Sequence, residues 1–269
     1  MQVLKQFMAH FGIPPEKSEL RLLNEVASAF SRLPYENITK IIKLEESGSP
    51  AKSRRSPGEV IGNHISWGAG GTCFSLTSAL MHMVRSLGWE AEYLLADRPY
   101  GQDTHCALLV SIDGQPHLLD PGFLIVKPIA ISGECREEIA TAFNRIVLAP
   151  AGNEKISLST FREGKVTRRL TYKTQPVDAS QFLKAWDASF GWEMMRYPLL
   201  TRVTGAGQIY LNGARLQINR IDSTERRHIS AGDLISQISE QFGINPVLVE
   251  RAISILRNQG ETIGKTSER

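Results

Sequence analysis

The segment GAGGTCFSLTSAL, residues 68–80, crowds three glycines against a single cysteine, Cys73. Apolar side chains continue from this cysteine at helical spacing, for example at Leu76 and Leu80, so we expect a helix from Cys73 to about Gly88. The positive end of a helix dipole favours a thiolate over a thiol, and backbone amides at such a start can hold a developing oxyanion. The segment makes Cys73 a candidate nucleophile; the simpler alternative is a small buried core residue.

A nucleophilic thiolate needs a base, and the base needs an orienting partner. The segment DTHCALLVSIDGQPHLLDPGF, residues 103–123, supplies both in one predicted hairpin. If the Asp-Gly pair at 113–114 forms a two-residue turn, Asp120 lies diagonal to His105 on the same sheet face. The carboxylate would then hold the imidazole in one tautomer and stabilise its charged form. A three-residue turn would reverse the parity and separate the two side chains.

The three cysteines, Cys73, Cys106 and Cys135, contain no CxxC pair. An odd and sparse set is typical of proteins kept reduced, so we expect no disulfide framework and a cytoplasmic location. Cys106 follows the candidate base His105 and should point to the opposite face of a regular strand, into the core. Cys135 lies in a polar segment and is expected to be incidental. The six histidines show no HExxH pattern, so we expect no metal site.

The chain divides into three zones by its periodicity. Residues 1–90 are expected to be helical, with a helix over 18–33 and an exposed polar connection over 45–59. Residues 91–190 carry period-two segments, and residues 191–269 are mixed and end in a frayed tail. The expected strands are 91–97, 105–112, 116–120, 144–150 and 168–173, followed by helices at 180–190 and 231–243 and a hairpin within 201–219.

The composition is that of an ordinary globular protein, with 42% hydrophobic and 22% charged residues over 269 positions. The formal charge of +3 is small, and the basic clusters at 52–55, 168–169 and 226–227 have no interleaved aromatic residues. These clusters are expected to be solvated faces, so nucleic acid is not an expected partner. We also find no signal-peptide pattern and no stretch near the ~20 apolar residues of a membrane span, so no membrane partner is expected.

The order Cys, His, Asp in the segments GGTCF, THCALLV and LLDPGF resembles the arylamine N-acetyltransferases, whose motifs are RGGxCF, TH on a strand and a VDVGFG-like segment. SRLPYENITK is similar to that family's PFENL segment, and ISEQFGI to its closing helix. The resemblance implies an α+β fold: an N-terminal helical bundle over 1–90, a central β-barrel-like domain over 91–190 and a C-terminal α/β lid over 191–269. It also implies ping-pong transfer of an acetyl group from acetyl-CoA, or of a similar acyl group, to an arylamine or hydrazine.

The family's motifs assign roles to particular residues of this chain. Cys73 would be the nucleophile, His105 the base and Asp120 its orienter, and Tyr35 would border the acceptor pocket. The implied partners are a small-molecule amine and acyl-CoA as a co-substrate, with no tightly bound cofactor; the oligomeric state stays open. The remaining residues expected to bind substrate by motif are Gly71, Thr72, Phe74 and Thr104.

The chain departs from the family's pattern at several positions. Ala69 stands where RGGxCF has its arginine, the usual partner of the glutamate that is Glu36 here, and a buried carboxylate without a cation is costly. Arg54 and Arg55 are candidate replacements. Ser75 follows the CF pair where the family has glutamate, and Tyr35 and Pro121 also differ. Two alternatives therefore stay open: a related thiol enzyme (amide synthase, transglutaminase-like enzyme or amidase) and a non-enzymatic binding protein.

Overall fold

The computed structural model describes residues 1–15, 18–131 and 136–261. Cys135 and the tail expected to be frayed lie outside these residues. None of the helices within them is both long and apolar enough to cross a membrane.

The first part of the chain is helical, as expected. A helix begins at Cys73, and the expected helix over 18–33 is observed at Glu19–Phe30. The segment 45–59 is largely exposed or half-buried, as expected, but Ser53 and Arg55 within it are buried. Ser56 and Glu59 form a capping box that starts a helix at Pro57. The helices are α1 (Gln2–Phe11), α2 (Glu19–Phe30), α3 (Ile38–Ser47), α4 (Pro50–Ser53), α5 (Pro57–Trp67) and α6 (Cys73–Ser86).

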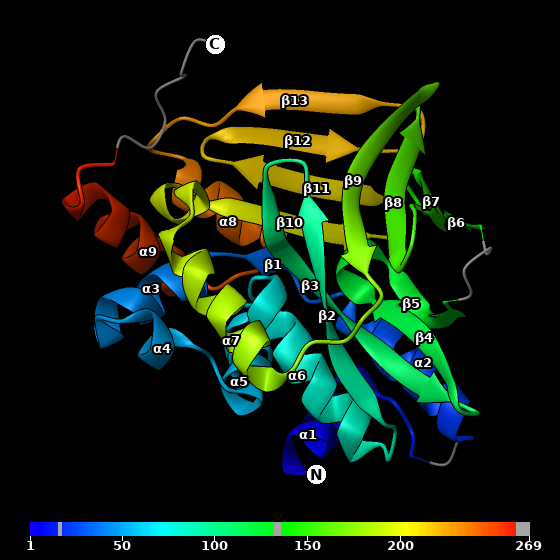
Figure 1. Ribbon diagram of the computed structural model, residues 1–269. Coiled ribbons are helices and arrows are strands. Elements are labelled where there is room, and N and C mark those ends of the chain that lie inside the picture. Colours follow the sequence, from blue (N-terminus) through cyan, green and yellow to red (C-terminus); the bar gives the residue numbers. More distant parts are fainter. Residues whose placement is uncertain (16–17, 132–135, 262–269) are drawn as a thin grey trace.

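The middle of the chain forms an antiparallel, barrel-like sheet of eight strands, in the order β5-β4-β3-β2-β9-β8-β7-β6 (Figure 1). The five strands expected from the sequence are all present, and β5, β6 and β8 were not anticipated. The fold is α+β, as expected. The strands are β2 (Ala91–Arg98), β3 (Gly101–Ile112), β4 (Gln115–Asp120), β5 (Ile125–Ala130), β6 (Glu137–Ala140), β7 (Arg145–Pro150), β8 (Lys155–Arg162) and β9 (Lys165–Lys173).

The last part of the chain forms a second sheet, in the order β1-β10-β11-β12-β13. The segment 201–219 contains most of three strands rather than a single hairpin. The short strand β1 pairs with β10, so Glu36 lies opposite Leu200 and the first part of the chain shares a sheet with the last. The division at residues 90 and 190 stays a prediction. The elements are β1 (Tyr35–Glu36), α7 (Ala179–Ala188), β10 (Leu199–Thr204), β11 (Gly207–Asn212), β12 (Arg215–Asn219), β13 (Thr224–His228), α8 (Leu234–Phe242) and α9 (Pro246–Asn258).

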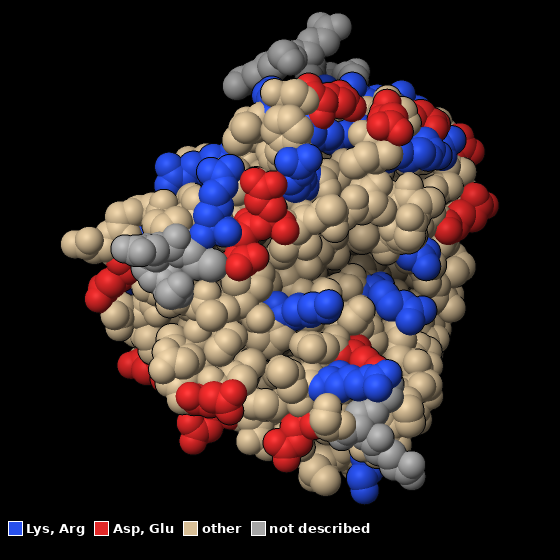
Figure 2. Space-filling model, turned by 90° about the vertical axis from the view of Figure 1, so that its right-hand side faces the viewer, with Lys and Arg blue, Asp and Glu red and all other residues tan. Residues whose placement is uncertain are grey.

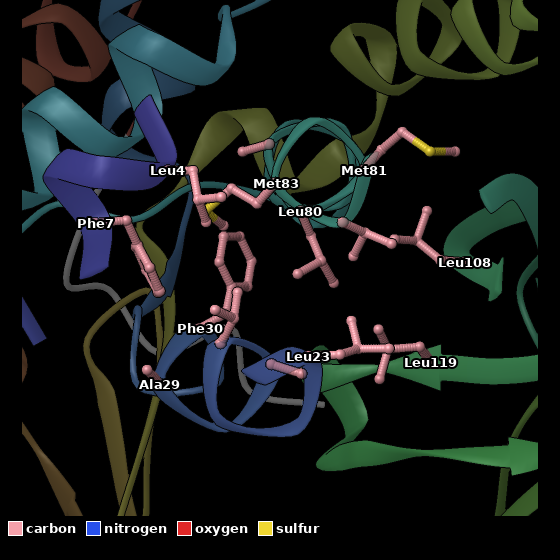
Figure 3. Close-up of a cluster of buried hydrophobic side chains, with 14 of the residues drawn as sticks. Leu4, Phe7, Leu23, Ala29, Phe30, Leu80, Met81, Met83, Leu108 and Leu119 are labelled. Carbon is pink, nitrogen blue, oxygen red and sulfur yellow. The ribbon is translucent and has the colours of Figure 1, made fainter. Parts of the chain in front are cut away.

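Helix α6 is held between the first two helices and the large sheet. Figure 3 shows Leu80 pointing from α6 toward Leu23 of α2 and Leu119 of β4, while Met83 extends toward Leu4 of α1 and Phe30 of α2. All of these side chains are buried, and full burial of a side chain of this size contributes about 1.5–3 kcal/mol. This packing fixes the start of α6, and with it Cys73, against the sheet.

The face that lies to the right in Figure 1 is hollowed. Figure 2 shows this hollow with Lys and Arg side chains at its lower edge.

Candidate active site

The start of α6 is built by a close approach of two backbone segments. Gly71 forms a bridge with Tyr35, and the Glu36 N–H donates to the Gly71 carbonyl at 3.0 Å. A Cβ on Gly70 would lie 1.8 Å from the Pro34 carbonyl oxygen, so no other residue fits there. The glycines thus let β1 run against the turn that presents Cys73 as the first residue of the helix.

The hairpin of β3 and β4 brings the candidate base and its partner together. Ile112 pairs with Gln115 across a two-residue turn, so the predicted register is confirmed. The His105 Nε2 and an Asp120 carboxylate oxygen lie 2.6 Å apart, and both side chains are buried. Burial lowers the pKa of His105, but the charge of Asp120 and the hydrogen bonds to Asp120 and Cys73 together raise it above its ordinary value.

Two aromatic side chains that the sequence did not indicate hold this pair. The Tyr172 hydroxyl donates to the same Asp120 oxygen at 2.7 Å. The Phe123 ring meets the His105 ring edge-on at 5.0 Å between centroids. Tyr172 comes from β9, two strands away from His105 in the sheet order, and nothing in its local sequence marks it. The carboxylate is thus fixed from both sides, which restricts the orientation of the imidazole.

The two nitrogens of His105 have different partners. Nε2 faces Asp120, whose ionised carboxylate only accepts hydrogen bonds, so Nε2 carries a proton. Nδ1 lies 3.2 Å from Nη2 of Arg98, and the Cys73 thiol is hydrogen-bonded to the same ring. An arginine has no acceptor, so Nδ1 is the acceptor in this contact. The ring is therefore in the tautomer that can take a proton from the thiol.

Cys106 contacts Cys73, which the sequence reasoning missed. It is a core residue, as expected, but the cluster it belongs to contains Cys73 and Phe74. The Cys106 thiol forms a hydrogen bond with the Cys73 sulfur, and this bond, with help from His105, lowers the pKa of Cys73 well below its ordinary value despite burial. Burial and the same contact raise the pKa of Cys106, so Cys106 keeps its proton and can donate it. Its position directly after His105 was the available indication.

A buried ion pair replaces the one that the resemblance implies at Ala69. Arg55 Nη1 lies 3.8 Å from the Glu36 carboxylate, and both side chains are almost fully buried. The same nitrogen donates to the Gly70 carbonyl and to Thr39 Oγ1, each at 2.7 Å. Burial raises the pKa of Glu36, and the Arg55 charge opposes that shift. Arg55 is thus not on a solvated face, and it braces the glycine turn before Cys73.

The other residues expected to bind substrate are spread around this centre. Thr72 precedes α6 and is buried, and Thr104 Oγ1 donates to the Gly101 carbonyl at 2.9 Å. Phe74 is fully buried against Phe182 and two tryptophans, so its ring belongs to an aromatic core. Tyr35 is half-buried, and burial, together with the charge at Cys73, raises the pKa of its hydroxyl.

A buried lysine that the sequence did not indicate also lies near Cys73. Lys40 donates to the Ser189 hydroxyl at 2.6 Å and to its carbonyl at 2.9 Å. Its ammonium lies 4.4 Å from the centre of the Phe190 ring. Burial lowers the pKa of Lys40 to about 7, partly offset by the charge at Cys73.

Comparison with known proteins identifies the class to which this fold and site belong. The model of the N-acetyltransferase family matches residues 19–250. The arylamine N-acetyltransferase of M. smegmatis is similar at 21% identity and a TM-score of 0.77, covering 94% of this chain and 98% of that chain. The enzyme of Mycobacterium marinum has 17% identity and a TM-score of 0.79, covering 97% of this chain and 100% of that chain.

A Bacillus cereus arylamine N-acetyltransferase, described as having a unique Cys-His-Glu catalytic triad, has 17% identity and a TM-score of 0.71, covering 91% of this chain and 99% of that chain. A sequence search against curated proteins finds no match. The family match spans most of the chain, and the chain belongs to the arylamine N-acetyltransferase family. It is an acyltransferase enzyme.

Proposed function

We propose that this enzyme moves an acetyl or similar acyl group from acyl-CoA to an arylamine or hydrazine by a ping-pong mechanism, through a thioester on Cys73. The observation that carries the proposal is the contact between the Cys73 thiol, at the start of α6, and the His105 imidazole, whose Nε2 lies against Asp120. A thiol, a base and an orienting carboxylate in this sequence of contacts make a nucleophile at neutral pH.

In the first half-reaction His105 takes the Cys73 proton, and the thiolate attacks the carbonyl carbon of the acyl-CoA. The negative charge that develops on the carbonyl oxygen is stabilised by backbone amides at the start of α6. When the carbon–sulfur bond to CoA breaks, His105 returns its proton to the departing thiolate. The Cys106 thiol, which donates to the Cys73 sulfur, stabilises the attacking thiolate before this step.

In the second half-reaction an amine nitrogen attacks the thioester, His105 takes a proton from it, and Cys73 leaves as the thiolate. A weakly basic aromatic amine or hydrazine is neutral at pH 7 and can attack directly. An alkyl amine such as lysine, with an ordinary pKa near 10.4, is mostly protonated and is a poor acceptor. Tyr35, Gly71, Thr72, Phe74 and Thr104 are proposed to shape the substrate site around this chemistry.

Initial-rate kinetics with both substrates varied tests the proposal. Acetyl-CoA and an aromatic hydrazine should give parallel double-reciprocal lines, since the first product leaves before the second substrate binds. Cys73→Ala should abolish transfer without unfolding the protein, as followed by circular dichroism. Intersecting lines, or amide hydrolysis without any CoA-dependent transfer, would contradict the proposal and favour the related thiol enzymes.

A further inference from the structure

A guanidinium lies beside the base without a carboxylate of its own. Arg98, the last residue of β2, is half-buried; its Nη2 donates to His105 Nδ1 and its Nη1 to the Tyr100 hydroxyl at 2.9 Å. Its central carbon lies 5.6 Å from the Phe123 ring centre and 5.9 Å from that of Tyr100. Tyr100 is 71% exposed, so this side of the guanidinium is next to solvent.

The charge of Arg98 is not neutralised by an acidic side chain. Among residues 1–15, 18–131 and 136–261, no Asp or Glu forms an ion pair with Arg98, and its buried Nε has no hydrogen-bond partner. The neighbouring Asp97 pairs with Lys173, and the Asp120 carboxylate is hydrogen-bonded to His105 and Tyr172. The partners of Arg98 are thus neutral acceptors, so an anion brought to this site would meet a positive charge that no carboxylate neutralises.

Arg98 and the candidate nucleophile contact the same imidazole ring. The Arg98 Nη2 lies 3.2 Å from His105 Nδ1, the Cys73 thiol is hydrogen-bonded to His105, and the charges of Arg98 and Cys73 interact, so the guanidinium lies near the sulfur. An acyl group attached to Cys73 therefore lies close in space to the Arg98 guanidinium. The charge of Arg98 interacts with that of Cys73 once the thiol is ionised.

Acylation changes the surroundings of this cation. The thiolate becomes a neutral thioester, and His105 becomes neutral when it gives its proton to the CoA thiolate. Arg98 then has only the neutral ring nitrogen and the Tyr100 hydroxyl as hydrogen-bond acceptors. A carboxylate one methylene beyond the thioester carbonyl would give the guanidinium a charged, two-oxygen acceptor.

We propose that Arg98 selects an acyl donor with a terminal carboxylate, of the malonyl type, so that the thioester on Cys73 is a half-thioester of a short dicarboxylic acid. This inference rests on the proposed function. Atoms balance as for acetyl transfer: the Cys73 sulfur bonds the acyl carbon, the bond to CoA breaks, and the CoA thiolate takes the proton from His105. The acyl carboxylate stays ionised throughout. An aromatic amine with a para carboxylate could also bring a carboxylate to the site. Its carboxylate lies on the far side of a rigid ring from the reacting nitrogen, so a carboxylate on the short acyl group lies closer to Arg98.

Intact-protein mass spectrometry under single-turnover conditions tests the proposal. The rate of adduct formation is measured with malonyl-CoA, with its monomethyl ester and with acetyl-CoA. The wild-type enzyme should react about 10- to 100-fold faster with malonyl-CoA than with the neutral ester, as expected for a charge-assisted hydrogen-bonded pair. Arg98→Gln should remove this preference, and Arg98→Lys should restore part of it. Arg169→Gln, which removes a neighbouring cation bonded to Thr160, is the matched control and should keep the preference.

Each result has a defined meaning. Equal wild-type rates with malonyl-CoA and its ester overturn the inference, even if the Arg98 variants do not fold. If Arg98→Gln lowers the rate of adduct formation equally with all three donors, the inference is also overturned, because Arg98 then acts on His105 or on the CoA portion that the donors share. The acetylated enzyme is also reacted with 4-aminobenzoate and with 4-aminobenzamide. If Arg98→Gln slows only the reaction with 4-aminobenzoate, Arg98 binds the carboxylate of the acceptor, and the donor assignment is overturned. No adduct with any donor overturns the proposed function instead.

Discussion

Replacing Arg55 with methionine removes the cation from a fully buried ion pair. Arg55 and Glu36 have exposed side-chain fractions of 4% and 0%. Removing one partner of such a pair leaves an uncompensated charge and costs about 3–5 kcal/mol. For a protein of this size, 1 kcal/mol corresponds to about 2–4 °C, so the melting temperature should fall by about 6–20 °C. Thermal and urea unfolding followed by circular dichroism measure both quantities.

The loss should also depend on pH. The pKa of Glu36 is already raised by burial, against the opposing charge of Arg55, and without Arg55 it should rise further. Above the ordinary pKa of a glutamate, the folded variant then binds a proton that the unfolded chain does not. Its free energy of unfolding therefore falls as the pH rises through this range, and the deficit relative to wild type should be larger at pH 8 than at pH 5.

A neighbouring arginine provides the control. Arg54 pairs with Asp187, but the two side chains are 26% and 32% exposed, so Arg54→Met should cost no more than about 1 kcal/mol. Ala69→Arg, which places a second cation in a fully buried position beside Arg55, should destabilise the wild-type protein. If Arg55→Met costs no more than Arg54→Met, the pair is not essential and the reasoning is refuted.

Three further predictions concern the site. Cys106→Ala should raise the pKa of Cys73 and so move the pH midpoint of its alkylation by iodoacetamide upward; an unchanged midpoint would exclude the contact between the two thiols. In the wild type, Cys73 should alkylate far faster than Cys106. Asp120→Asn should keep the fold and lower turnover at least about 100-fold, because an asparagine favours the wrong tautomer; turnover near that of wild type would contradict its role. Because the pKa of Lys40 is lowered to about 7 in the folded protein, the unfolded chain binds one more proton than the folded protein between about pH 7 and 10.5. The free energy of unfolding of the wild type should therefore rise with pH relative to that of Lys40→Met, and parallel plots of the two against pH would contradict this.

The parts of the site that the sequence predicted are those set by local rules. The helix start at Cys73 follows from glycines and helical periodicity within one segment. The contact between His105 and Asp120 follows from a two-residue turn and the alternation of side chains along a strand. The turn residues Asp113 and Gly114 both have positive φ values, of 52° and 72°, as this turn type requires.

The parts that were missed depend on contacts between distant segments. Arg55 lies in a segment whose polar composition suggested exposure, and only the folded chain shows that Glu36 draws it inside. The capping box of Ser56 and Glu59 was a readable helix start that composition obscured. Alternation along the strand correctly predicted that Cys106 points into the core, and Cys106 pairs regularly with Leu95, but only the folded chain shows that Cys73 of α6 packs in the same cluster. Nothing near Arg98 in the sequence indicates its partner.

If Cys73 carries the acyl group during transfer, the mass of the intact protein must reveal it. After incubation with acetyl-, propionyl- or malonyl-CoA in the absence of an amine, the protein should gain the mass of one acyl group. Peptide mapping should place that group on Cys73, a hydrazine should remove it, and Cys73→Ala should show no adduct. If no donor leaves an adduct while amide hydrolysis or transamidation is detectable, the account is contradicted.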